Sequence, residues 1–237
     1  MERSGGSRRS NPESVHYPWI ASLRSQRRHT SLNTYCFSDI LFPMRVVTFD
    51  IETANFFTDV NSSDPADLTI AIVCIHDSET GLYSSYLVPE LPQLWPILER
   101  TDILVGYNSD HFDIPLLNKY YPGDLTKLKS VDIMKEVHGA LGRRLKLDMI
   151  AEGTLGQKKL DGKGGQSVIW WREGRVNDVR EYCLKDVELT RKIFDHALKN
   201  KSLKYKELGK THEIKLNTAS WLTQAPQKAA MTFTLGL

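Results

Sequence analysis

The sequence has few cysteines, no long apolar run and almost no net charge. Its three cysteines, Cys36, Cys74 and Cys183, form no pattern typical of a disulfide framework or a zinc site, which favours a reducing, cytoplasmic compartment. No stretch approaches the length of a membrane span, and no apolar signal-peptide core precedes a cleavage site. With 31 basic and 29 acidic residues, the formal net charge is only +2, which excludes the strongly basic field of nucleic-acid packaging proteins.

The residue pattern divides the chain into three parts. Residues 1–43 are rich in Ser, Arg and Asn, with six arginines and few periodic apolar positions. They are interpreted as a disordered basic arm that touches nucleic acid, as an organellar transit segment, or as an over-long gene start ahead of Met44; we favour the last. Residues 44–200 have the length and composition of one globular domain. Residues 201–237 are expected to form a basic appendage, with a β-hairpin and a tail that frays from about Thr218.

Within residues 44–200, β-branched and apolar runs alternate with helical patterns. We expect three strands, the last two joined as a hairpin, and then helices interleaved with shorter strands. The expected strands are 45–52, 68–76, 82–88, 102–107 and 128–132, and the expected helices are 91–100, 114–120, 133–141, 148–155 and 175–198. This order predicts an α/β fold in which helices pack on a mixed sheet.

Two acidic residues end the first expected strand. Because side chains alternate between the faces of a strand, Asp50 and Glu52 point the same way. The alternate positions, which face the opposite side, are the apolar Val47, Phe49 and Ile51. A solvated strand face would also explain two exposed acids. However, the flanking pattern is that of a buried strand, in which neighbouring carboxylates repel each other unless a cation lies between them.

Asp113 ends the run Asn108–Asp113, just after the strand expected at 102–107. It lies two residues before Pro115, which suits the first turn of a helix. An aspartate in this place either caps the helix N-terminus or is a metal ligand, and the local sequence favours neither.

The long helix expected at 175–198 carries Tyr182 and Asp186 one turn apart on the same face. The two residues lie at the border of the predicted apolar stripe, which consists of Val176, Val179, Cys183, Val187, Thr190, Phe194 and Ala197. A carboxylate at the edge of a core is unfavourable unless it is paired or binds a metal. The alternative is a tyrosine packed in the core beside a solvated aspartate.

In this order, the three pieces resemble the Exo I, Exo II and Exo III motifs of the DEDD-type 3′-to-5′ exonucleases. The segments that carry the resemblance are Phe49–Thr53, Gly106–Asn108 with Phe112–Pro115, and Tyr182–Asp186 in the tyrosine form of the third motif (DEDDy). The motifs are most similar to those of the exonuclease domain of family B DNA polymerases and of stand-alone YprB-type ribonuclease-H-like domains. The match runs from Val46 to about Ala197, and the remaining residues are too few for a polymerase palm or fingers.

The resemblance implies a ribonuclease-H-like fold, with two divalent cations, Mg²⁺ or Mn²⁺, bound at the four acids of the motifs. These acids are Asp50, Glu52, Asp113 and Asp186. Oxygen-only donors suit such hard ions, whereas zinc calls for His or Cys. Tyr182 would orient the attacking water, since a phenol is a poor base at neutral pH. The residues implied in substrate binding are Asn108 and Thr53.

The sequence therefore predicts a metal-dependent 3′-to-5′ exonuclease that acts on single-stranded DNA or RNA, or on fraying 3′ ends. Two alternatives remain: a non-catalytic nucleic-acid-binding module, and a structure-specific endonuclease on the same fold. The intact acid set favours catalysis, because a binding module has no need of four mutually repelling carboxylates. No obligate protein partner is indicated, and the choice between DNA and RNA rests on local contacts to the 2′-hydroxyl group.

Two adjacent tryptophans, Trp170 and Trp171, offer a surface on which bases could stack. Because adjacent residues of a helix cannot both face one way, at least one of the two is expected to lie in the core.

Overall fold

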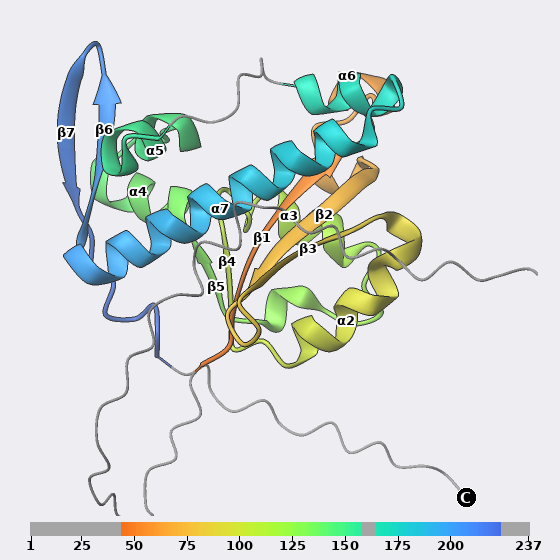
Figure 1. The fold of residues 1–237 in the computed structure, drawn as a ribbon, viewed down its shortest axis with the longest axis horizontal. Helices are drawn as coiled ribbons and strands as arrows, with labels where there is room; N and C mark the ends of the chain where they lie inside the picture. Colours follow the sequence, from red (N-terminus) through yellow and green to blue (C-terminus); the bar gives the residue numbers. More distant parts are fainter. Residues whose placement is uncertain (1–43, 158–164, 224–237) are drawn as a thin grey trace, which may run out of the picture. The chain divides into compact units, whose positions relative to one another are not determined.

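The structure is a computed structural model that describes residues 44–157 and 165–223. Its main sheet has five strands in the order β3-β2-β1-β4-β5 (Figure 1). The strands are β1 (Val46–Thr53), β2 (Ile70–Asp77), β3 (Leu82–Tyr86), β4 (Ile103–Gly106) and β5 (Ser130–Asp132). β2 runs antiparallel to both β1 and β3, whereas β1, β4 and β5 run parallel. The predicted α/β fold with a mixed sheet is confirmed.

The helices of the described residues are α1 (Phe57–Val60), α2 (Leu91–Glu99), α3 (Asp113–Asn118), α4 (Ile133–Leu141), α5 (Leu147–Leu155), α6 (Gln166–Arg172) and α7 (Val176–Asn200). Helices α2, α3, α4, α5 and α7 lie close to the five ranges that the sequence pattern predicts, whereas α1 and α6 were not predicted. Short 3-10 turns lie at Pro65–Asp67, Val88–Glu90 and Leu125–Lys127. No helix among the described residues is both long enough and apolar enough to cross a membrane.

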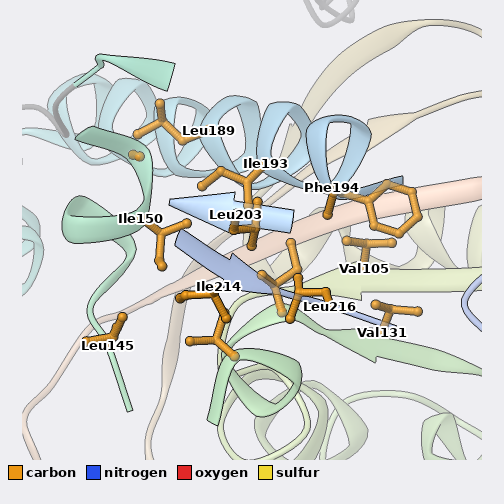
Figure 2. Packing of buried hydrophobic residues seen from close by; sticks show 14 of the residues in the cluster. Val105, Val131, Leu145, Ile150, Leu189, Ile193, Phe194, Leu203, Ile214 and Leu216 are labelled. Atoms are coloured by element: carbon orange, nitrogen blue, oxygen red, sulfur yellow. The ribbon is translucent and has the colours of Figure 1, made fainter. Parts of the chain in front are cut away.

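The two faces of the sheet bury separate apolar clusters. One cluster joins Phe49 of β1 and Ile75 of β2 to α2 and α3. The other joins Val105 of β4 to α4, α5 and α7, and its side chains interdigitate beneath α7 (Figure 2). Because side chains alternate along β1, the residues on either side of Phe49 face the α7 side of the sheet.

The long helix α7 crosses the second face of the sheet from one end to the other (Figure 1). Gly174, whose φ of 73° suits glycine, lies two residues before its start, and the helix ends at Asn200, where the C-cap residue Lys201 adopts the left-handed conformation. The predicted stripe is buried except for the half-buried Val176. The buried face of α7 is wider than the predicted stripe, because Tyr182 and Asp186, which were expected at the border of the stripe, are themselves buried.

Strands β6 (Ser202–Glu207) and β7 (Lys210–Lys215) form the expected hairpin after α7. The hairpin packs on α5, where Gly153 lies so close to the Tyr205 backbone that a Cβ atom would come within 2.5 Å of it. The Thr154 hydroxyl donates to the Lys204 carbonyl at 2.7 Å and accepts from the Lys204 N–H at 2.8 Å. The hairpin thus shares the buried cluster of α5 and α7.

The stretch after the hairpin differs from the expected fraying. Thr218 and Trp221 are buried, and the Trp221 ring stacks on Phe194 of α7 with 5.5 Å between the ring centroids. A single large aromatic residue thus anchors a stretch that has no periodic pattern. The expectations for residues 1–43 and for the tail at 224–237 concern residues outside those that the structure describes.

Candidate active site

Asp50 and Glu52 lie where β1 extends beyond the end of its neighbour β4. Only residues 46–48 of β1 pair with β4, whereas pairing with β2 continues to Thr53. The alternation along β1 places both carboxylates on the α7 face of the sheet, as predicted, while Ile51 between them is buried on the opposite face. Beside the two acids, β1 is therefore paired with β2 alone among the described strands.

Asp186 reaches this pair from α7. Asp50, Glu52 and Asp186 each offer one carboxylate oxygen, and these three atoms all lie within 4.8 Å of one another. Asp186 is only 3% exposed, and the other two acids are half-buried. Carboxylates this close in partly buried surroundings repel one another, and a cation between them relieves the repulsion. The oxygen-only donors fit a hard divalent ion such as Mg²⁺ or Mn²⁺. We call these three residues the acidic triad.

Asp113 lies beside the acidic triad but outside the group of atoms within 4.8 Å. Burial raises the pKa of Asp113 well above its usual value, and the negative charges of Asp50 and Glu52 raise it further. Its Oδ1 atom accepts a hydrogen bond from the Ile51 N–H at 3.0 Å. Since a carboxylate has two oxygens, this bond does not exclude Asp113 from a metal site.

The structure also bears on the alternative that Asp113 caps a helix. Asp113 is the first residue of α3, the N-cap position is Phe112, and no side chain caps this helix. The Asp113 carboxylate accepts from the backbone of β1 instead, so the structure does not show the capping alternative, and the role of Asp113 as a metal ligand stays a prediction.

Tyr182 is buried one helical turn before Asp186, on the same side of α7. Its ring meets the Trp170 ring of α6 edge to face, with 5.8 Å between the centroids and 80° between the planes. Trp170 is thus the tryptophan of the pair that packs against the site. The sequence had identified the pair but not the residue that Trp170 contacts.

Asn108 occupies the turn between β4 and α3 with a φ of 67°, a left-handed conformation that asparagine tolerates. Asp132 stabilises this turn, because its carboxylate accepts from the Asn108 N–H at 2.8 Å and from the Asp110 N–H at 3.1 Å. The same carboxylate caps α4 by accepting from the Met134 N–H. Asp132 thus supports both this turn and the start of α4, and its link to Asn108 could not be seen in the sequence.

The Asn108 backbone is held by Asp132, whereas the oxygen of the Asn108 side chain has no such hydrogen bond within the described part of the chain. Its Oδ1 atom is buried and accepts no hydrogen bond from the described residues. By contrast, the Thr53 hydroxyl donates to the Asn55 carbonyl at 3.0 Å in the turn that follows β1. The roles of Asn108 and Thr53 in substrate binding stay predictions, and Thr53 also has a structural contact.

The chain is similar to a known protein family and to solved structures. The sequence model of the RNase_H superfamily matches residues 47–198. No curated protein matches the sequence. Among solved structures, the family B DNA polymerase from the hyperthermophilic archaeon Pyrobaculum calidifontis is similar, with a TM-score of 0.52 and 20% sequence identity. The similarity covers 66% of this chain and 25% of the polymerase chain, so the two share a fold over about a quarter of the polymerase.

Proposed function

The chain belongs to the RNase H superfamily, and from this premise we propose that it is a metal-dependent nuclease that shortens single-stranded DNA or RNA from the 3′ end. The observation that carries the proposal is the acidic triad, with Asp113 beside it. These four acids come from the three motifs that resemble those of DEDD-type exonucleases. The shared fold with a family B DNA polymerase agrees with this reading.

The acidic triad, together with Asp113, would hold the divalent cations. When bound, such ions activate a water molecule and neutralise charge on the phosphate. The protein's own part is to hold the carboxylates in place before any ion binds. β1 fixes Asp50 and Glu52 by its pairing with β2, and α7 fixes Asp186 by burying it against the sheet.

Tyr182 and Asn108 would act on the water and on the substrate. A phenol has a pKa of about 10 and therefore keeps its proton at neutral pH, so Tyr182 would orient the attacking water by hydrogen bonding rather than remove its proton. Asn108 would contact the nucleic acid through its amide group, as the resemblance implies, with its backbone held by Asp132.

The same observations favour an enzyme over a non-catalytic binding module. Asp113 is buried beside acids that raise its pKa, which destabilises the folded protein at neutral pH unless a cation compensates. A module that only binds nucleic acid would gain nothing from this repulsion. Catalysis by bound cations would explain why Asp113 lies beside the acidic triad.

The test uses 5′-labelled single-stranded DNA and RNA incubated with the protein and Mn²⁺ or Mg²⁺. We expect a ladder that shortens one nucleotide at a time from the 3′ end, and we expect a 3′-terminal phosphorothioate linkage to slow it. Internal fragments from a 3′-blocked substrate would point instead to an endonuclease. Retention of the label on intact, bound strands with either metal would point to a binding module.

A further inference from the structure

Helix α6 packs on α7 and β1, the two elements that carry the acidic triad (Figure 1). Its Trp170 is half-buried, and its ring lies edge to face against the Tyr182 ring, with 5.8 Å between the centroids. This geometry is the favourable one for two aromatic rings, because the positive edge of one meets the negative face of the other. Trp170 therefore restricts the positions that the Tyr182 side chain can take.

Trp170 is itself fixed by a charged residue at the start of α7. The Arg175 guanidinium lies over the Trp170 ring, 5.2 Å from the centroid, in a cation–π contact. Arg175 is oriented in turn by Asp178, whose carboxylate accepts from Nε at 2.6 Å. The next residue, Trp171, is also half-buried, but it makes no ring contact with Tyr182 within the described part of the chain. Of the two tryptophans, Trp170 is thus the one whose ring contacts Tyr182.

We propose that Trp170 is a positioning residue for the reaction, which holds the Tyr182 hydroxyl in the direction of the attacking water. The inference rests on the proposed function. A hydroxyl that orients water contributes only while its direction is fixed, and a displacement of about 1 Å can slow an enzyme about a hundredfold. Tyr182 is one turn of α7 away from Asp186, so a swing of its side chain about the Cα–Cβ bond moves the hydroxyl relative to the acidic triad. Trp170 opposes that swing through its ring contact, and Arg175 and Asp178 keep Trp170 in place.

The experiment is a double-mutant cycle between Trp170→Leu and Tyr182→Phe, measured by single-turnover cleavage of a 5′-labelled single strand. Trp170→Leu alone is expected to slow cleavage about tenfold, with KM and Mn²⁺ affinity unchanged. In the Tyr182→Phe background, where no hydroxyl remains to be positioned, the same substitution is expected to change the rate less than about twofold. Ile169→Ala, at an exposed position of the same helix, is the matched control and is expected to leave the rate unchanged in both backgrounds.

Equal slowing by Trp170→Leu in the two backgrounds overturns the proposal, because the tryptophan would then act without the tyrosine hydroxyl. A wild-type rate for Trp170→Leu overturns it as well. If the leucine variant does not fold, Trp170→Phe takes its place, and its smaller ring is expected to give a smaller loss with the same dependence on Tyr182. Failure of this inference is distinct from failure of the proposed function, since the latter would appear as absent cleavage by the wild-type protein.

Discussion

The Cys183 thiol donates a hydrogen bond to the backbone carbonyl oxygen of Asp50, with 3.3 Å between sulfur and oxygen. Burial raises the pKa of Cys183 well above its usual value, so the thiol keeps its proton and remains a donor at neutral pH. Cys183 lies between Tyr182 and Asp186 in α7. The bond therefore joins α7 to β1, the two elements that carry the acidic triad, close to the triad itself.

Cys183→Ala should separate α7 from β1 slightly and loosen the site. It removes the hydrogen bond and some buried volume, and we expect the free energy of unfolding to fall by roughly 1–2 kcal/mol. Cleavage should slow several-fold, because Asp186 is then less well fixed against Asp50. Cys183→Ser retains a donor and should lose less activity. Urea unfolding and single-turnover rates measure the two effects, and a wild-type rate for Cys183→Ala would show that the bond does not position the triad.

Removal of a charged ligand should abolish the reaction without unfolding the protein. Asp50→Asn and Asp113→Asn keep the shape of the side chain, and the asparagine oxygen at 113 can still accept from the Ile51 N–H. We expect cleavage to fall by at least about three orders of magnitude. The melting temperature in chelator should stay the same or rise, because one repulsive charge is removed.

The matched control for this loss is Asp148→Asn, an exposed acid in the first turn of α5. Its cleavage rate should equal that of the wild type. Near wild-type turnover by either of the site variants would mean that the four-acid site is wrong.

Tyr182→Phe removes one hydroxyl and keeps the ring against Trp170. If the hydroxyl orients water, kcat should fall by about 10–10³-fold, which corresponds to about 1.4–4 kcal/mol. KM and Mn²⁺ affinity should change little, because the contribution is made mainly in the transition state. A purely structural tyrosine predicts instead that single-turnover rates are equal for the variant and the wild type.

His76 should make stability depend on pH, independently of the site. It is buried in β2, and burial lowers the pKa of His76 from 6.5 to about 4. Between these two values the unfolded chain binds a proton that the folded protein does not, so stability is full above pH 6.5 and is lost as pH falls toward 4. We expect the free energy of unfolding in chelator to decrease by about 1–2 kcal/mol from about pH 7.5 to about pH 5 through this group.

His76→Phe should make the pH profile flatter by this amount while it retains the ring contact with Tyr83. Urea titrations at several pH values give the comparison. Profiles of equal slope for the wild type and the variant would show that His76 titrates alike in the folded and unfolded states.

The parts of the site that follow from local periodicity could be predicted from the sequence. The period of two along β1 places Asp50 and Glu52 on one face, and the helical period places Tyr182 and Asp186 on one side of α7. The part played by Asp113 could not be settled in this way, because a cap and a ligand occupy the same place at a helix end. The structure adds a contact that the sequence does not indicate, a hydrogen bond from the N–H of Ile51, 62 residues away, to Asp113 Oδ1.

Contacts between elements that are far apart in the sequence could not be predicted either. The burial of Trp221 depends on a ring stack with Phe194, and no pattern near Thr218 indicates it. Similarly, the role of Trp170 depends on how α6 lies against α7, which neither helix specifies alone. Tertiary packing decides these points, and local propensity does not.

The central claim is that Asp50, Glu52 and Asp186 bind a divalent cation, and calorimetric titration of Mn²⁺ into the metal-free protein tests it most directly. The wild type and the Asp148→Asn control should bind Mn²⁺ with the same affinity. Asp186→Asn should bind it at least about tenfold more weakly, since one charged ligand is lost. Binding by Asp186→Asn that equals the wild type, or no binding by the wild type, would contradict the claim.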